Sequence, residues 1–342
     1  MPNIITIQHL LSHQQEYCIV DVRTPAEFEK GHIPSAVNIP IFTNEERAIV
    51  GTLYVQQGKS VAIKKGLELV GPKMKWFIDS VEDVISKTHN KNLLVHCWRG
   101  GMRSASMAWL FELYGLQVSV LKGGYKYFRR HVLDTLEKQY PFIILGGFTG
   151  TGKTHILKQL RILGEPVIDL ELLAGHKGSA FGWLGEPYQP TQEHFENMLA
   201  VELLYHNNVS RIWLEDESRR IGNVNIPLGL WNQMREVTLI VANVPVEQRI
   251  QNLLQDYSHF TTDELMDSLV RLRQRLGGAV SKEAEEALQQ RNLTRVIELT
   301  LVYYDKYYTR SMEQREREKI KVINLTGTSV TENAEFLLKY VY

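Results

Sequence analysis

The chain has 342 residues, 44% of them hydrophobic and 23% charged, which is ordinary for a globular protein and excludes a disordered or fibrous one. Lysine plus arginine and aspartate plus glutamate number 39 each, so the net charge gives no general attraction to nucleic acid, although a local basic face stays open. At roughly 100–200 residues per domain, this length predicts two domains.

Two further features narrow the class of protein. No apolar run approaches the roughly 18 residues of a membrane span, and the N-terminal residues lack the basic and apolar regions of a secretion signal, so we expect a cytoplasmic protein. Only two cysteines occur, Cys18 and Cys97, which excludes a disulfide framework and a four-thiolate zinc site.

The first half of the chain alternates short apolar runs with helical stretches, the pattern of a parallel α/β domain. The predicted strands are 18–22, 36–40, 92–97 and 118–124. Helices are predicted at 74–86 and 103–114. Residues 43–72, rich in glycine and lysine, are expected to form a long connection that is neither a plain strand nor a plain helix.

A second α/β pattern follows a polar stretch at 130–141 that ends in proline, so we place the two domains at 1–135 and 136–342. The strands predicted in the second domain are 142–148, 166–170, 211–215, 238–244 and 321–325. A long helical region is predicted at 246–319, with a break at Gly277 and Gly278.

A cysteine in a glycine-containing, arginine-ended turn stands at the end of a strand in the first domain. The segment HCWRGGMRS (96–104) places Arg99 and Arg103 around the turn, and its glycines let the backbone N–H groups curl inward. Oriented amides and positive neighbours stabilise a thiolate and any bound oxyanion. We therefore predict that Cys97 is reactive, the alternative being a buried strand-end cysteine beside solvated arginines.

Together with DVRTPAEFEKGHIPSAVNIP (21–40) and LKGGYKYFR (121–129), this cysteine loop resembles the rhodanese family over about the first 130 residues. The resemblance implies a doubly wound parallel domain in which Cys97 carries sulfur or selenium as a persulfide or perselenide. The family positions that we take to be structural ties between strand and turn are Asp21, Arg23, Glu27 and His32.

The cysteine loop departs from the usual rhodanese in one respect. Five residues separate Cys97 from Arg103, one more than in a sulfur-transferring rhodanese, and the segment also fits the H-C-x5-R-S pattern of cysteine phosphatases. A phosphatase needs a general acid, and residues 98–102 contain none, although an acid from elsewhere in the chain stays open. A larger loop suits a larger anion, and we expect selenophosphate.

A second anion-binding motif, GFTGTGKT (147–154), follows a predicted strand and precedes a helix. It has the form G-x4-G-K-T, in which backbone amides hold a diphosphate and the lysine adds a positive charge. The residues expected to bind the diphosphate are Gly147, Gly150, Gly152, Lys153 and Thr154. Thr154 is also placed to reach a divalent ion such as Mg²⁺. The motif predicts phosphate binding and leaves hydrolysis open.

Acidic residues follow the third strand of this second domain. Glu215, Asp216 and Glu217 stand where phosphate-loop hydrolases place a magnesium ligand. Arg219 and Arg220 follow them and are candidates to meet a second anion. A solvated strand end is an equally good interpretation, so the sequence leaves the metal unknown. The loop at 176–196, rich in glycine and aromatic residues, is expected to line an apolar ligand groove.

The motifs taken together are similar to the tRNA 2-selenouridine synthase family over nearly the whole chain. The segments that carry the similarity are HCWRGGMRS, GGFTGTGKT, GSAFG, QPTQEHFE, EDESRRIG, Leu-Gly-Gly at 276–278 and YYDKYY at 303–308. The pairing of a rhodanese-like domain with a P-loop NTPase-like domain is more specific than either motif alone.

The resemblance implies a selenotransferase that replaces the sulfur of wobble 2-thiouridine in tRNA by selenium from selenophosphate. It further implies a tRNA geranyltransferase activity, because a geranylated 2-thiouridine made from geranyl diphosphate has a better leaving group than the free thiocarbonyl. The phosphate loop would bind the diphosphate of the prenyl donor and stabilise the charge that builds up on it. No tightly bound cofactor and no consumption of ATP are implied.

Basic residues in two groups are candidates to contact tRNA phosphates, with solvated surface as the alternative. They are Lys122, Lys126, Arg129, Arg130, Arg271 and Arg275. Arg271 and Arg275 are four residues apart and share one helix face. The tyrosines at 303–308 are candidates to stack a flipped wobble base, or else packing residues of a helix.

Two other functions stay open. An ATP-dependent tRNA thiolation or kinase-type fusion would bind nucleotide at the phosphate loop and turn over without geranyl diphosphate. A binding module with a rhodanese fold and no chemistry would keep its activity after Cys97→Ala. The physics of the sequence does not by itself distinguish a prenyl diphosphate from a nucleotide.

Overall fold

The chain folds into two compact units in the computed structural model, which describes residues 2–88, 90, 92–186, 188–325 and 329–341. The first unit is Met1–Leu136 with Glu193–Tyr205, and the second is Glu137–Gln192 with His206–Tyr342. Each contains a parallel sheet and helices, which confirms the predicted α/β class. The sequence pattern gave no sign that Glu193–Tyr205 belongs with the first unit.

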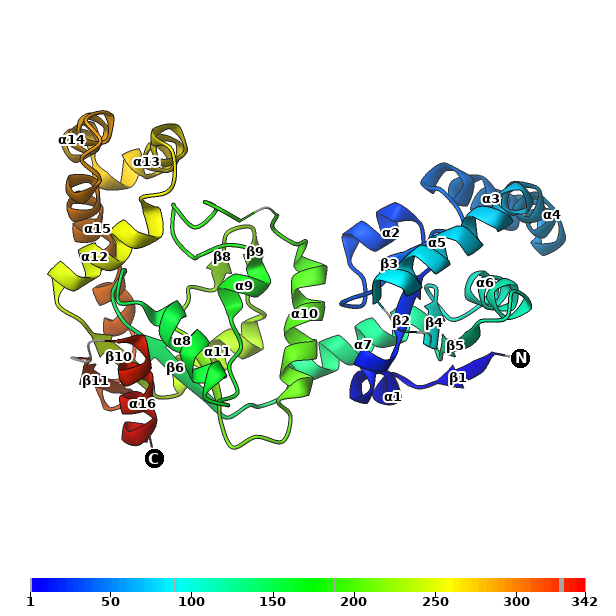
Figure 1. Ribbon diagram of the computed structural model, residues 1–342, viewed down its shortest axis with the longest axis horizontal. Coiled ribbons are helices and arrows are strands. Elements are labelled where there is room, and N and C mark those ends of the chain that lie inside the picture. Colours follow the sequence, from blue (N-terminus) through cyan, green and yellow to red (C-terminus); the bar gives the residue numbers. More distant parts are fainter. Residues whose placement is uncertain (1, 89, 91, 187, 326–328, 342) are drawn as a thin grey trace. The chain divides into compact units, whose positions relative to one another are not determined.

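A five-stranded parallel sheet in the order β1-β5-β4-β2-β3 forms the centre of the first unit (Figure 1). Its strands are β1 (Asn3–Ile5), β2 (Cys18–Asp21), β3 (Val37–Asn38), β4 (Asn92–His96) and β5 (Gln117–Leu121). The four predicted strands are therefore confirmed. β1 was not predicted, because three residues are too few to show an alternating pattern.

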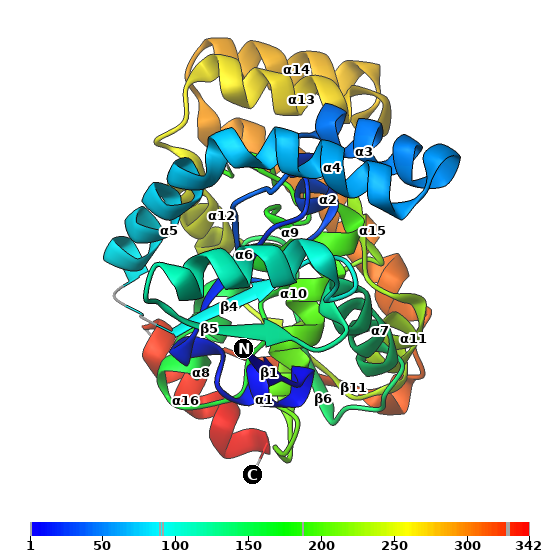
Figure 2. The ribbon, with the colours of Figure 1, turned by 90° about the vertical axis from the view of Figure 1, so that its right-hand side faces the viewer.

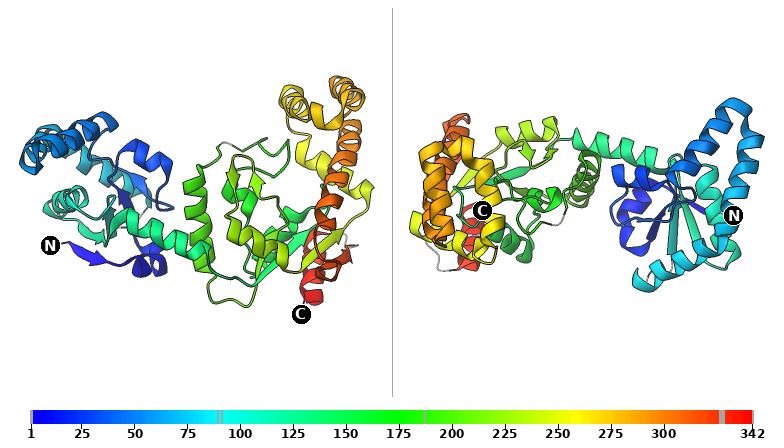
Figure 3. Two further views of the ribbon diagram at one scale, coloured as in Figure 1. Left: turned by 180° about the vertical axis from the view of Figure 1, so that it is seen from behind. Right: turned by 90° about the horizontal axis from the view of Figure 1, so that it is seen from above.

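Helices lie on both sides of this sheet (Figure 3). The helices of the first unit are α1 (Ile7–Ser12), α2 (Pro25–Lys30), α3 (Asn44–Gln57), α4 (Lys59–Val70), α5 (Met74–Thr88), α6 (Met102–Leu113), α7 (Gly124–Leu136) and most of α10 (Gln192–Tyr205), with short 3-10 turns at Gln14–Glu16 and Gly71–Lys73. α6 lies over β4 and β5 (Figure 2), and its Phe111 packs with Phe77 of α5 against Val20 and Val95 of the sheet.

Residues 43–72 are a correction to the sequence analysis, because they form the two helices α3 and α4 and not a long irregular connection. Thr43 and Glu46 form a capping box that starts α3, and Gly58, at φ 89°, joins the two helices. None of the residues of α3 is buried. A helix without a buried apolar face lacks the periodicity on which the sequence prediction relied.

The second unit is built on a four-stranded parallel sheet in the order β11-β10-β6-β7. Its strands are β6 (Phe142–Gly146), β7 (Ile212–Glu215), β10 (Leu239–Asn243) and β11 (Ile320–Asn324), and β8 (Arg220–Ile221) pairs with β9 (Val224–Asn225) in a separate hairpin. The strand predicted at 166–170 is reduced to a single bridge between Val167 and Trp213. It ends there because Asp169 accepts the N–H of Leu172 at 2.9 Å and starts a helix.

The helices of the second unit fall into two groups. Those beside the sheet are α8 (Lys153–Ile162), α9 (Leu170–Ala174), α11 (Leu228–Glu236) and α16 (Val330–Val341). The helical segment comprises α12 (Val246–Tyr257), α13 (Thr262–Leu276), α14 (Gly278–Gln289) and α15 (Leu293–Glu313), followed by a 3-10 turn at Arg317–Lys319.

The helical segment projects from the sheet at one end of the unit (Figure 3). Leu265 and Leu269 of α13 pack with Leu288 of α14 and Val296 of α15 in a core of their own. Gly277, at φ 82°, separates α13 from α14, which confirms the predicted break. Over the part of the chain that the structure describes, no helix has both the length and the apolar content needed to cross a bilayer.

Candidate active sites

Cys97 lies directly after β4, at the base of the turn that was predicted to be reactive. Only 3% of its surface is exposed. Its Sγ accepts the backbone N–H of Gly101 at 3.3 Å and lies 3.3 Å from Oγ of Ser104. The loop thus places one amide donor on the sulfur, while the hydroxyl of Ser104 also donates to the carbonyl of Gly101 at 3.1 Å.

The glycine pair of the LKGGY segment packs against this cysteine loop. Gly124 has φ 59°, and a Cβ at this position would collide with the backbone of the loop, including the carbonyl of Cys97. The N–H of Tyr125 donates to that same carbonyl at 2.9 Å. The two glycine-containing segments, far apart in sequence, therefore form one rigid turn around Cys97.

The two arginines of the cysteine loop have different surroundings. Arg103 is held by Glu27 through N···O distances of 2.7 Å and 3.3 Å. Burial acts to raise the pKa of Glu27, but the bonds from Arg103 outweigh it and leave that pKa lowered. Arg99 is exposed on the turn. In this conformation Arg99 is open to an incoming anion, whereas Arg103 ties α6 to α2.

Behind the loop, buried charges connect β2 to the turn that follows it. Asp21 binds Arg23 with a closest N···O distance of 2.6 Å, and Arg23 also donates to the carbonyl of Gly31 at 2.7 Å. His96 is fully buried with its Nε2 3.7 Å from Asp21. Burial lowers the pKa of His96 in spite of that carboxylate, so this ring is neutral at pH 7.

Helix α10 contributes side chains to the first unit from the second half of the chain. Asn197 donates to the hydroxyl of Tyr125 at 2.8 Å, and that hydroxyl donates to Glu193 at 2.8 Å. Arg129, one of the predicted tRNA contacts, binds Asn197 and Glu196. Arg129 is therefore engaged within the unit, a role that sequence reasoning missed, although the QPTQEHFE motif marked the start of this helix.

The other basic candidates of the first unit are on its surface. Lys122 and Lys126 are exposed, and Arg130 is exposed with its side chain 3.4 Å from Asp134. They remain candidates for contact with tRNA phosphates.

The phosphate loop lies between β6 and α8, as predicted. Gly150 and Gly152 have φ values of 83° and 76°, a region that favours glycine, and a Cβ on Gly150 would meet the carbonyl of Arg249 at 2.7 Å. Nζ of Lys153 donates to the carbonyl of Gly147 at 2.8 Å. The lysine thus lies over its own loop, within reach of a phosphate held by the amides.

Side chains of the helical segment hold the phosphate loop from outside. Asn252 of α12 donates to the carbonyl of Gly150 at 2.8 Å, and Arg249 donates to that of Thr149 at 2.8 Å. Arg249 is in turn paired with Asp305 of α15 at 2.5 Å and 3.0 Å. The conformation of the phosphate loop is therefore coupled directly to α12, about a hundred residues further along the chain, and through Arg249 to α15 beyond it.

Tyr308 and Asp216 form a second support for the loop. The hydroxyl of Tyr308 accepts the N–H of Gly147 at 2.8 Å and donates to Asp216 at 3.0 Å. Asp216 is also bound by Arg315 at 2.8 Å. Burial and the neighbouring Asp216 charge raise the pKa of Tyr308 well above its usual value. Asp216 thus supports the loop and does not join the other carboxylates, in contrast to its predicted place in a second anion or metal site.

Three glutamates converge beside the phosphate loop. One carboxylate oxygen from each of Glu171, Glu215 and Glu217 lies within 4.8 Å of the others. Oγ1 of Thr154 donates to Glu171 at 3.3 Å. Oε1 of Glu215 is buried without a hydrogen-bond partner among the described residues. Glu171 was missed from the sequence, and the only signal for it was an acidic residue just after the short strand at Val167.

Burial raises the pKa of all three glutamates, and repulsion from Glu171 raises those of Glu215 and Glu217 further, while the Lys153 charge opposes both effects. Clustered carboxylates beside a threonine hydroxyl are the oxygen ligands that Mg²⁺ prefers. The residues present therefore fit a hard divalent cation better than a soft one.

A groove of about 1180 Å³ begins at Lys153, Thr154 and the carboxylates. Its lining includes Arg271 and Arg275, both predicted to contact tRNA, and Arg271 lies 4.8 Å from the ring centre of Trp183. Further lining side chains are Lys177, Arg220, Tyr303 and Tyr307. Arg219 and Arg220, both predicted for a second anion site, are exposed, and Arg220 is the one that lines the groove.

Comparisons with known proteins cover both units. Residues 140–335 match the model of the tRNA 2-selenouridine synthase AAA domain, and residues 6–131 match that of the rhodanese-like domain. Among solved structures, the N-terminal domain of a protein from Clostridium difficile 630 is 40% identical, covers 38% of this chain and 99% of its own, and has a TM-score of 0.36.

Relatives extend over most of the chain. The tRNA 2-selenouridine synthase of Aeromonas salmonicida is 34% identical over 336 residues, which cover 87% of this chain and 88% of that protein. The enzyme of the same name from Shewanella oneidensis is 35% identical over 333 residues, with coverage of 87% and 86%. With two domain models matched in the order of the two units, the chain belongs to the tRNA 2-selenouridine synthase family.

Proposed function

We propose that this protein is a tRNA-modifying transferase that replaces the sulfur of wobble 2-thiouridine by selenium, through a geranylated intermediate. The observation that carries the proposal is the presence, in one chain, of two anion-binding loops of different chemistry. One loop presents a sulfur atom to an oxyanion, and the other presents amides and a lysine beside three carboxylates.

In the first step, the phosphate loop binds geranyl diphosphate through its amides and Lys153. The sulfur of 2-thiouridine attacks C1 of the geranyl chain and forms a C–S bond, the C1–O bond breaks, diphosphate leaves with the electron pair, and the uracil N3 proton is released. Lys153 stabilises the charge that grows on the departing diphosphate.

Glu171, Glu215, Glu217 and Thr154 are the residues that would hold Mg²⁺. Such an ion supplies positive charge to a diphosphate as it leaves. The buried Oε1 of Glu215 supports this assignment, because a buried carboxylate oxygen without a partner costs free energy until a cation or a proton satisfies it.

In the second step, Cys97 carries selenium to the geranylated base, which loses geranyl thiol. Selenium in selenophosphate is at the oxidation level of selenide, so loading it on Cys97 as a perselenide breaks the P–Se bond, forms an S–Se bond and releases phosphite. Attack on C2 of the base then expels geranyl thiolate, which takes up a proton. Cleavage of the remaining S–Se bond consumes two electrons from an added thiol.

The exposed Lys122, Lys126 and Arg130 and the groove residues Arg271 and Arg275 are the proposed contacts to tRNA phosphates. Such an enzyme acts where tRNA is decoding, which places it in the cytoplasm.

The test is to incubate wild type and Cys97→Ser with 2-thiouridine tRNA, geranyl diphosphate, selenophosphate and dithiothreitol, and to identify the wobble nucleoside by mass spectrometry. Wild type is expected to give selenouridine, and the variant to stop at geranylthiouridine. Phosphorus NMR of the wild-type reaction tests whether Cys97 carries selenium as a perselenide. Release of phosphite would support this step, and release of phosphate alone would contradict it. An unchanged base together with turnover of ATP would replace this proposal by the ATP-dependent alternative.

A further inference from the structure

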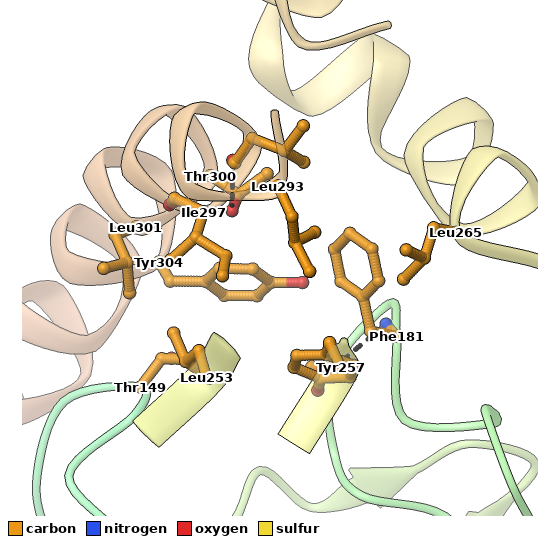
Figure 4. A pocket seen from close by; sticks show the side chains of 12 residues that line it. Thr149, Phe181, Leu253, Tyr257, Leu265, Leu293, Ile297, Thr300, Leu301 and Tyr304 are labelled. Atoms are coloured by element: carbon orange, nitrogen blue, oxygen red, sulfur yellow. Dashed lines mark hydrogen bonds between the residues drawn. The ribbon is translucent and has the colours of Figure 1, made fainter. Parts of the chain in front are cut away.

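A small apolar cavity lies beside the phosphate loop (Figure 4). Thr149 of the loop and Leu253 of α12 form one wall, and Phe181 lies opposite, on the loop 176–186. Leu293 and Ile297 of α15 lie above them in the same view. Apart from hydroxyl groups, the lining side chains are aliphatic or aromatic, so the cavity has little to offer a charged or strongly polar ligand.

The cavity adjoins the groove that starts at Lys153. The side chains that line both are Thr149, Ser179, Leu253, Tyr257 and Tyr304. Across from Thr149, the cavity is lined by Leu265 of α13 and Leu293 of α15. A ligand with its diphosphate on the loop would therefore meet apolar side chains next to the loop. The base and ribose of a nucleotide would need polar partners there.

The cavity is nearly closed in this conformation. Its volume of about 30 Å³ is roughly the share of one water molecule in the liquid. The ring of Tyr304 crosses its middle, and the hydroxyl of Tyr304 accepts the N–H of Ala180 at 3.1 Å. Phe181 follows Ala180 on the same loop. Movement of this loop would therefore widen the cavity and break the hydrogen bond of Tyr304 at the same time.

We propose that this cavity receives the terminal isoprene unit of a prenyl diphosphate and that Leu265 and Leu293 limit the length of the chain it accepts. The inference rests on the proposed function, since it requires that the phosphate loop hold a prenyl diphosphate. The groove wall formed by Leu253 and Tyr257 accommodates the first isoprene unit, next to the reacting carbon. The pocket then distinguishes donors by length, because all prenyl diphosphates share the same head.

The test compares dimethylallyl, geranyl and farnesyl diphosphates as donors to 2-thiouridine tRNA, by kcat/KM for each. Leu293→Ala removes side-chain volume from the cavity wall across from Thr149. We expect it to raise the ratio of farnesyl to geranyl transfer roughly tenfold, the factor by which one or two methylene groups typically change discrimination between substrates. Thr300→Leu fills the cavity from α15, and we expect it to raise the ratio of dimethylallyl to geranyl transfer by a similar factor.

Leu269→Ala is the matched control, because Leu269 is buried in the same core as Leu265 and does not line the cavity. It loses the same side-chain volume, so its donor ratios should equal those of wild type even if its stability falls. Wild-type rates that do not depend on chain length, or ratios in both cavity variants equal to those of Leu269→Ala, would overturn the inference. Absence of any prenyl transfer by wild type would instead contradict the proposed function.

Discussion

At the scale of single residues, both proposed active sites depend on groups that are costly to keep where they are. Glu215 is buried next to two other carboxylates, and Gly124 has a backbone conformation that other residues rarely adopt. Polar groups and strained backbone of this kind are retained where a ligand or a close approach requires them. Substitution of Glu215 tests the site at the phosphate loop, and substitution of Gly124 tests the cysteine loop.

We expect Glu215→Gln to raise the melting temperature of the second unit at pH 7.5 by about 2–4 °C, which corresponds to about 1 kcal/mol. The folded-state pKa of Glu215 is raised above its usual 4.5, so its favourable contribution is complete below pH 4.5 and is lost as the pH rises through the raised pKa. The difference between variant and wild type should therefore vanish near pH 4.5. Differential scanning fluorimetry across pH measures it.

Magnesium provides the complementary observation for Glu215→Gln. If the three glutamates hold the ion, a saturating concentration of Mg²⁺ should stabilise wild type by about 2–3 kcal/mol and the variant by less. Glu286→Gln, an exposed substitution on α14, is the control and should behave as wild type in both respects. Equal stabilisation of Glu215→Gln and wild type by Mg²⁺ would contradict the assignment.

We expect Gly124→Ala to abolish selenation and to leave geranylation intact, because the new Cβ would displace the backbone around Cys97. The backbone strain alone costs of order 1–3 kcal/mol. Gly115→Ala separates the two effects, since Gly115 also has a positive φ, 101°, but a Cβ there meets nothing within 4 Å. Mass spectrometry of the wobble nucleoside should show lost selenouridine only for Gly124→Ala, and similar losses in both variants would count against a role in shaping the cysteine loop.

At the scale of helices and strands, the second unit connects its helical segment to the phosphate loop. Arg249 and Asn252 of α12 bind the loop carbonyls, and Asp305 and Tyr308 of α15 lie behind them. These helices also line the apolar cavity. A movement that admits the hydrocarbon chain therefore acts on the same two helices that fix the position of the diphosphate.

We expect Asp305→Asn to weaken binding of geranyl diphosphate about tenfold, or about 1.4 kcal/mol, because Arg249 loses the charge that orients it toward Thr149. The side chain of Asp305 is 34% exposed, so solvent screens part of the ion pair and a larger loss is not expected. Isothermal titration calorimetry measures the affinity. Glu298→Gln, also on α15 but exposed, should bind like wild type, and an unchanged affinity in Asp305→Asn would show that the loop is held without this pair.

The sequence predicted the elements that carry buried, regular patterns and missed those that do not. The strands before Cys97 and Gly147 are nearly fully buried in parallel sheets, so they read as apolar runs ending at the two motifs. α3 buries no residue, so its sequence has no apolar face with helical spacing. Glu171 follows a single β-bridge at Val167, which is too short to show the pattern of a strand. The side chains that hold the phosphate loop come from helices 100 to 161 residues away, and only the fold brings them together.

At the scale of the whole molecule, the residues that form each site belong to one unit. The cysteine loop, Gly124 and Glu27 are in the first unit, and the phosphate loop, the three glutamates and the apolar cavity are in the second. Helix α10 departs from chain order, because its residues Glu193–Tyr205 belong to the first unit, where Asn197 binds Tyr125. If the proposed two steps take place at these two sites, the tRNA is the molecule that passes from one to the other.

We therefore expect two inactive variants to restore each other. Cys97→Ser should make geranylthiouridine tRNA, and Lys153→Ala, which lacks the charge on the departing diphosphate, should convert that tRNA to selenouridine once it is released. The two proteins mixed with selenophosphate and geranyl diphosphate should yield selenouridine by mass spectrometry, whereas each alone should not. If Lys153→Ala selenates purified geranylthiouridine tRNA but the mixture stays inactive, the geranylated tRNA is not released, and the base must pass between the two units of one chain.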